Sequence, residues 1–112
     1  MRIFRRKQFL SLPAGTIYAK GKRWYFSDFS VKADTLDNDW VQLSPMWIES
    51  RDDDDQFTKL EAMLEVGASY PMAESYGRDG FFDDDDLFLV PDRADLEQLR
   101  GIIDAALAVA KT

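Results

Sequence analysis

LFLVPDRADLEQLRGIIDAALAVA, residues 87–110, is the segment whose pattern indicates its structure most clearly. Its first four residues are apolar and are followed by Pro91, which predicts a short β-strand. Asp92 then occupies the expected N-cap position of a helix, with Asp95 three residues later. The residues expected on one apolar helix face are Leu96, Leu99, Ile102, Ile103, Ala106 and Ala110. The segment therefore predicts a strand followed by a long amphipathic helix.

A second helix is predicted in the middle of the chain. Four aspartates, residues 52–55, precede apolar residues at helical spacing, and Gly67 is a stop signal. The apolar residues of this helix are Phe57, Leu60, Met63 and Leu64. Residues 68–80 contain Pro71, Gly77 and Gly80, and they are predicted to form a loop.

The N-terminal segment predicts a short helix and a β-hairpin. Residues 5–12 are expected to form the helix, with Phe9 and Leu12 facing inward, before Pro13 and Gly15 end it. The two strands of the hairpin are predicted at residues 16–20 and 24–33, joined by a turn at residues 20–23.

A third strand is predicted at residues 40–48, after the turn-forming residues 34–39. Pro45 within it suggests an edge strand or a bulge. Strands come first and helices later, which is typical of the α+β class. We therefore expect a single globular domain of residues 1–112. It would contain a small antiparallel sheet, made of the N-terminal hairpin plus further strands, packed with two main helices, the longest at the C-terminus.

The composition excludes several classes of enzyme. The chain has 112 residues, of which 46% are hydrophobic, and it contains neither cysteine nor histidine. Thiol nucleophiles, disulfides, Cys/His zinc sites and histidine bases are therefore absent. Glycine-rich phosphate loops, dinucleotide fingerprints and G-x-S-x-G are also absent from the sequence. We expect a protein that is not an enzyme, with no catalytic residue and no cofactor.

Charge is distributed unevenly along the chain. Residues 1–32 hold eight basic residues and one acidic residue, a net +7, whereas residues 33–112 hold six basic and twenty acidic residues, a net −14. Together they give the net charge of −7. This asymmetry indicates either a charged partner or a basic segment that folds against the acidic remainder and neutralises it.

Two runs of aspartate supply a candidate protein-binding surface. They are Asp52, Asp53, Asp54, Asp55 and Asp83, Asp84, Asp85, Asp86. Neither run has the D-x-D-x-D-G spacing of a calcium loop, so no metal site is expected. The first run is suited to capping a helix and the second to a solvated loop. Alternatively, a dense row of carboxylates can mimic nucleic acid and bind a basic groove.

Basic and aromatic residues supply an alternative, ligand-binding site. Cations that hold phosphate beside rings that stack on a base are typical of nucleotide binding. The candidates are Lys20, Lys22, Arg23, Trp24, Tyr25, Tyr76 and Arg78. The simpler interpretation is a solvated turn with one side of the Trp24–Phe26 strand in the core, and Arg78 paired with Asp79 or Glu74. Long nucleic acid is disfavoured because the acidic remainder would repel it.

The sequence predicts neither a targeting segment nor a membrane helix. The N-terminal basic residues are not followed by an uninterrupted apolar region, and the longest apolar run is residues 105–110. A cytoplasmic location is therefore expected.

Three stretches resemble small acidic proteins of tailed bacteriophages and prophages. They are residues 9–21 (FLSLPAGTIYAKG), 67–71 (GASYP) and 76–80 (YGRDG). The resemblance carries over no catalytic residue, but it implies the cytoplasm of an infected bacterial host. It also implies a binding protein that inhibits a component of host antiviral defence, which we expect to act through the acidic surface. The alternatives are a sequestering protein for an anionic small molecule, such as a signalling nucleotide, and a structural or assembly protein.

Overall fold

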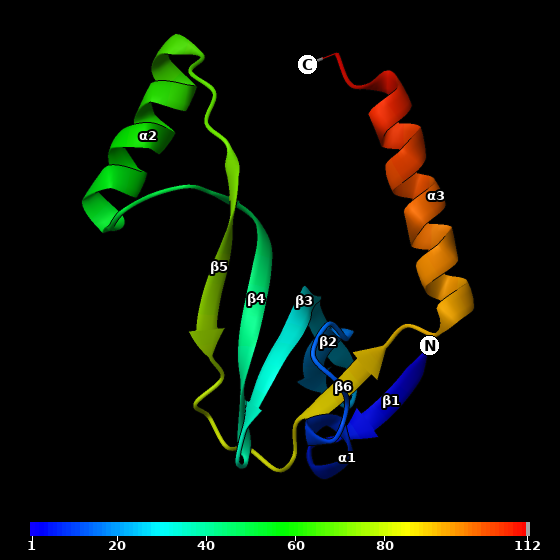
Figure 1. Ribbon diagram of the computed structural model, residues 1–112. Coiled ribbons are helices and arrows are strands. Elements are labelled where there is room, and N and C mark those ends of the chain that lie inside the picture. The colour runs from blue at the N-terminus through cyan, green and yellow to red at the C-terminus, as the bar shows by residue number, and fades with distance from the viewer. Residues whose placement is uncertain (112) are drawn as a thin grey trace.

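The computed structural model describes residues 1–111, in which six strands form one antiparallel sheet beside three helices (Figure 1). The elements are β1 (Arg2–Arg5), α1 (Arg6–Leu10), β2 (Ile17–Lys22), β3 (Tyr25–Leu36), β4 (Asp39–Ile48), α2 (Asp53–Val66), β5 (Met72–Arg78), β6 (Leu87–Val90) and α3 (Arg93–Val109). The strand order is β1-β6-β2-β3-β4-β5. The predicted α+β class, the antiparallel sheet and the longest helix at the C-terminus are confirmed.

Strand β6, which leads into the C-terminal helix α3, pairs with the N-terminal strand β1. It lies between β1 and β2, so that Phe88 pairs with Phe4 on one side and with Lys20 on the other. The Met1 amino group then donates to Asp95 Oδ2 at 2.7 Å and to Asp92 Oδ2 at 3.1 Å, in the first turn of α3. Strand β6 has the predicted bounds, whereas β1 was not predicted because its four residues include two arginines and lack a strand pattern.

The β2–β3 hairpin turns later than the sequence predicted. Strand β2 continues through Lys22, which pairs with Tyr25, so the turn is at Arg23 and Trp24 rather than at residues 20–23. Gly21 lies inside the strand beside an irregularity in register. A Cβ atom at Gly21 would lie 1.9 Å from the backbone oxygen of Tyr25. The glycine therefore permits a close approach of two strands instead of forming the turn.

Strand β4 is an interior strand with a bulge. Its register against β5 shifts between Ser44 and Trp47, which confirms a bulge near Pro45, but neighbours on both sides exclude an edge. The turn before β4 is shorter than predicted, because β3 extends to Leu36.

The loop predicted at residues 68–80 contains strand β5, so that prediction is wrong. The sequence MAESYGR is polar because β5 is an edge strand and all its residues except Ala73 are exposed. Such a strand is held by backbone pairing with β4 and needs no apolar face.

Four aromatic residues form the buried core. The ring of Phe9, from α1, stacks on Phe88 at a centroid distance of 4.1 Å and contacts Tyr18 at 4.7 Å and Trp40 at 5.0 Å. The Trp40 indole N–H donates to the Tyr18 hydroxyl at 2.9 Å. Burial raises the pKa of Tyr18 to about 12. The inward position of Phe9 is therefore confirmed, and the core lies where α1 packs on the sheet.

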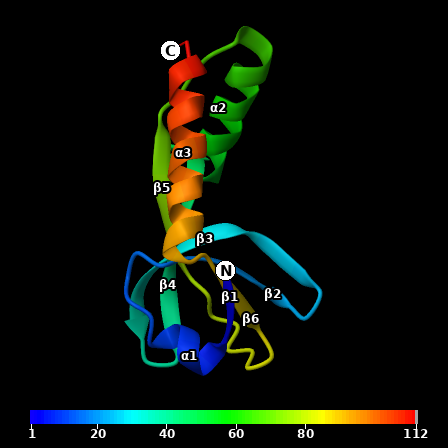
Figure 2. The ribbon, with the colours of Figure 1, turned by 90° about the vertical axis from the view of Figure 1, so that its right-hand side faces the viewer.

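Helices α2 and α3 extend away from this core (Figures 1 and 2). Both rise from the end of the molecule opposite α1, and neither has a buried residue. The radius of gyration of 16.5 Å exceeds the value of about 13 Å expected for a compact domain of this size. The expected packing of the two main helices on the sheet is thus not observed, because α1 and the aromatic rings already cover the buried part of the sheet.

Lys32 is a buried base whose replacement we expect to stabilise the fold. Its ammonium group donates to the Thr35 hydroxyl at 2.5 Å and lies 5.9 Å from the ring centre of Phe9. Burial lowers the pKa of Lys32 below 10.5, so the protonated amine opposes folding at neutral pH. We expect Lys32→Met to raise the free energy of unfolding by about 1 kcal/mol in urea denaturation at neutral pH.

The same measurement across pH tests the cause of this effect. Because the folded-state pKa of Lys32 is lowered, the wild type gains stability as pH rises from that pKa to the ordinary value of 10.5. The advantage of Lys32→Met should therefore shrink over this range. Lys7→Met, at an exposed lysine, is the control and should give no such trend. A constant difference between Lys32→Met and wild type would contradict the prediction.

Candidate functional site

The first aspartate run forms the start of α2. Asp52 is the N-cap, and its Oδ1 accepts the backbone N–H of Asp55 at 2.7 Å. Asp55 accepts the backbone N–H of Arg51 and pairs with Lys59 at 3.1 Å. These two interactions, in that order, lower the pKa of Asp55. Two of the four carboxylates are thus used to stabilise the helix, whereas Asp53 and Asp54 are exposed in its first turn.

The second aspartate run lies in the loop before β6, where it contacts strand β2. Asp83 pairs with Lys22 at 2.5 Å, and this interaction is the main cause that lowers the pKa of Asp83. Asp86 is buried and lies 2.9 Å from Lys22 and 3.4 Å from Lys20. Asp84 and Asp85 are exposed. The outer aspartates of the run therefore hold the loop on the sheet, and the central two face solvent.

Lys20 and Lys22 are neutralised by these carboxylates. Lys20 also pairs with buried Asp79 at 2.6 Å, and Asp79 in turn lies 3.5 Å from Arg6 Nη1. Arg6 is itself buried, with its guanidinium 4.9 Å from the Trp40 ring centre and donating to the carbonyl of Asn38. At these residues the basic N-terminal segment folds against the acidic remainder.

The residues of the alternative ligand site are spread over the sheet. A hollow of about 500 Å³ contains Lys20, Lys22 and Tyr25, but also Asp28, Asp79 and Asp86. Its carboxylates outnumber its lysines, which disfavours phosphate. Arg23 stacks on Trp24 at 5.1 Å in the exposed turn. The expected burial of one side of the Trp24–Phe26 strand is not observed, because Trp24 belongs to the turn and Phe26 is only half-buried.

Tyr76 and Arg78 lie on β5. Strand β4 lies between β5 and the β2–β3 hairpin, which carries the other candidate residues. The Tyr76 hydroxyl donates to Glu74 at 2.8 Å. Arg78 pairs with buried Asp39 at 3.0 Å, and not with Asp79 or Glu74 as the sequence suggested. Burial alone would raise the pKa of Asp39, but backbone N–H groups of Trp40 and Gly80, together with Arg78, hold it below its ordinary value. Arg78 therefore has a structural role, as the ion-pair partner of the buried Asp39 carboxylate.

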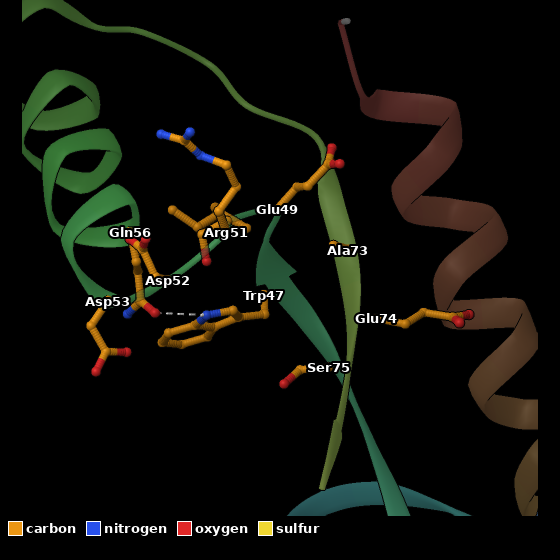
Figure 3. A pocket seen from close by; sticks show the side chains of 11 residues that line it. Trp47, Glu49, Arg51, Asp52, Asp53, Gln56, Ala73, Glu74 and Ser75 are labelled. Atoms are coloured by element: carbon orange, nitrogen blue, oxygen red, sulfur yellow. Dashed lines mark hydrogen bonds between the residues drawn. The ribbon is translucent and has the colours of Figure 1, made fainter.

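The sequence did not predict a hollow of about 410 Å³ between α2 and the β4–β5 pair (Figure 3). Trp47, which is 46% exposed, lies at its centre, and its indole N–H donates to Gln56 Oε1 at 3.3 Å. Asp52 and Asp53 lie beside the ring, and Ser75 lies across from them on β5. Among the lining residues that the structure describes, the one cation is Arg51, which points away from the indole and lies 3.6 Å from Asp55.

The hollow combines a half-exposed aromatic ring with carboxylates. A tryptophan face attracts cations, and a nearby carboxylate adds a direct charge interaction. A signal for this site was present in the sequence, since Trp47 closes a predicted strand a few residues before the first aspartate run. The sequence does not reveal the path of residues 49–52, which places the start of α2 beside the end of β4.

Comparison with known proteins gives no match: no family model, no curated protein and no solved structure is similar to the chain. Within residues 1–111, none of the helices has the length and apolar character needed to cross a membrane. The same residues contain no group of three or more carboxylates arranged to hold a metal ion.

Proposed function

We propose that the protein is a non-catalytic binding protein that engages a basic segment of a partner protein at the Trp47 hollow. The observation that carries this proposal is the half-exposed indole of Trp47 beside Asp52 and Asp53, in a hollow whose lining cation is turned away. An arginine or lysine side chain placed over the indole would contact both the ring and a carboxylate. Tryptophan is also among the residues that contribute most to protein interfaces.

The acidic surface around the hollow supports the same partner chemistry. Asp53 and Asp54 are exposed in the first turn of α2, and the helix as a whole carries five acidic residues and one lysine. A negative surface of this kind accelerates association with a basic partner and repels acidic ones. Asp84 and Asp85 belong to a different loop. The acidic surface proposed to bind the partner is therefore the first aspartate run alone.

The partner class follows from the resemblance to phage proteins. A basic, nucleic-acid-binding component of host antiviral defence, met in the cytoplasm of an infected bacterium, would present the required arginine and lysine side chains. Sequestration of an anionic nucleotide is less well supported, because Lys20 and Lys22 are already paired with carboxylates.

A short arginine-rich peptide is the probe for this proposal. In isothermal titration calorimetry we expect it to bind the wild-type protein, with an affinity that falls as salt rises. Trp47→Ala and Asp53→Ser should each weaken binding by about fivefold to tenfold, because each removes one contact to the bound cation.

Two matched variants act as controls for the peptide experiment. Trp24→Ala removes an exposed tryptophan of the hairpin turn, and Asp85→Ser removes an exposed aspartate of the other run. Both should bind the peptide as the wild type does. Equal weakening in the controls, or binding that does not depend on salt, would contradict the assignment of the hollow.

A further inference from the structure

Helix α3 carries an apolar stripe in which Leu99 is half-buried and the other residues are exposed. Leu96, Leu99, Ile103 and Ala106 recur at spacings of three, four and three residues, as in a two-stranded coiled coil. None of them is buried. Helix α2 extends from the same end of the sheet (Figure 2), and it also exposes apolar residues. The large exposed residues of the two helices are Phe57, Leu60, Leu64, Val66, Leu96, Ile102, Ile103, Leu107 and Val109.

The exposed apolar area is sufficient for a stable dimer only if both helices contribute. With about 150 Å² for a fully exposed large apolar residue, the large apolar residues of α3 expose roughly 400 Å², and those on the Phe57–Leu64 face of α2 expose roughly 300 Å². A specific interface buries about 800 Å² on each partner. The helices together provide most of that area, whereas either one alone provides at most about half of it.

We propose that a second copy of this chain covers these helices, with the two α3 helices parallel and in register. In a parallel pair, a residue that flanks the stripe faces the residue five positions later on the partner. Asp95, whose Oδ2 accepts from the Met1 amino group, then faces Arg100 of the second copy, and Ile102 faces its Leu107. One pair is of opposite charge and the other is apolar, and two-fold symmetry forms each pair twice.

The antiparallel arrangement lacks this complementarity. In an antiparallel pair, a residue that flanks the stripe faces a residue from the same side of the stripe on the second copy. Arg100 would then lie near an apolar residue such as Leu107 of the second copy. Charge opposes the binding of these helices to a lipid surface. Helix α2 carries five acidic residues and one lysine, and it would be repelled by anionic lipid.

Light scattering coupled to size-exclusion chromatography tests the association directly. We expect twice the mass of the chain, with dissociation on dilution. Ile103→Glu places a charge in the stripe and should weaken the association by at least about tenfold. Ala105→Glu, on the opposite face of α3, is the matched control and should remain dimeric. A wild-type monomer at all concentrations, or equal weakening by both variants, would overturn the proposal.

The role of α2 needs a variant of its own. Leu64→Glu should also weaken the dimer by at least about tenfold, whereas Thr58→Glu, on another face of α2, should not. An unchanged dimer in Leu64→Glu would overturn the shared interface. Binding of the wild-type monomer to anionic vesicles without self-association would assign the apolar faces to lipid instead.

Disulfide cross-linking tests the orientation, since the chain has no native cysteine. In a parallel, in-register pair, Leu99→Cys and Ala106→Cys should each cross-link to its own copy. An antiparallel pair brings at most one of these positions next to itself, so cross-linking at only one would overturn the register. Ile103→Glu should bind the arginine-rich peptide as the wild type does, which separates failure of this dimer from failure of the Trp47 site.

Discussion

Replacing Phe9 with alanine is expected to lower the free energy of unfolding by about 3–5 kcal/mol. Phe9 is fully buried, and its ring contacts the three other aromatic rings of the core. The alanine variant would leave a cavity between α1 and the sheet, which the rings of Tyr18, Trp40 and Phe88 cannot fill without losing their own contacts. Urea denaturation, followed by circular dichroism, measures the change.

The control is Phe81→Ala, in the exposed loop before β6. Phe81 is 77% exposed and lies 4.7 Å from the Lys20 ammonium, so its loss should cost less than about 1 kcal/mol. If Phe9→Ala fails to fold, Phe9→Leu should fold with a smaller loss, since it restores most of the volume. Similar small losses for Phe9→Ala and Phe81→Ala would show that the four rings are not the main source of stability.

Local sequence patterns predicted the elements whose signals lie within one segment. Strand β6 and helix α3 follow from an apolar run, a proline and an N-cap aspartate that are adjacent in the chain. Helix α2 likewise begins after Asp52 and ends at Gly67, which has the left-handed φ of 69° expected at such an end. These features need no knowledge of the remaining fold.

Elements that depend on a distant partner were not predicted. Strand β5 has a polar sequence and exists because β4 offers it a row of backbone groups. Strand β1 exists because β6 returns from the other end of the chain. In the hairpin, Gly21 was assigned to a turn because glycine is common in turns, but here it permits the approach of Tyr25.

The same distinction between local and distant partners applies to the candidate site residues. The capping role of Asp52 could be read from the sequence, because both partners lie within one helical turn. The pairing of Lys22 with Asp83 could not, since 61 residues separate them. The uneven charge of the chain allowed either a charged partner or internal neutralisation, and the pairs of Lys20, Lys22 and Arg6 show internal neutralisation at these three residues.

Replacing Asp79 with asparagine is expected to lower the free energy of unfolding by about 3–5 kcal/mol. Its carboxylate is 2% exposed and lies within 3.5 Å of Arg6 and 2.6 Å of Lys20, and it also accepts the backbone N–H of Phe81. Lys20 keeps Asp86 as a partner in the variant, but the buried guanidinium of Arg6 would lose its carboxylate and keep the Asn38 carbonyl and the rings of Trp40 and Phe82. An uncompensated buried charge is the main source of the loss.

A double-mutant cycle identifies that source. If the cost of Asp79→Asn comes from stranding Arg6, then Arg6→Met combined with Asp79→Asn should cost less than the two single changes added together. Asp84→Asn, in the solvated centre of the second aspartate run, should change stability by less than about 0.5 kcal/mol. Additive losses would instead assign the cost to the contacts of Asp79 with Lys20 and with the Phe81 backbone, and the Arg6 pair would then contribute little to the fold.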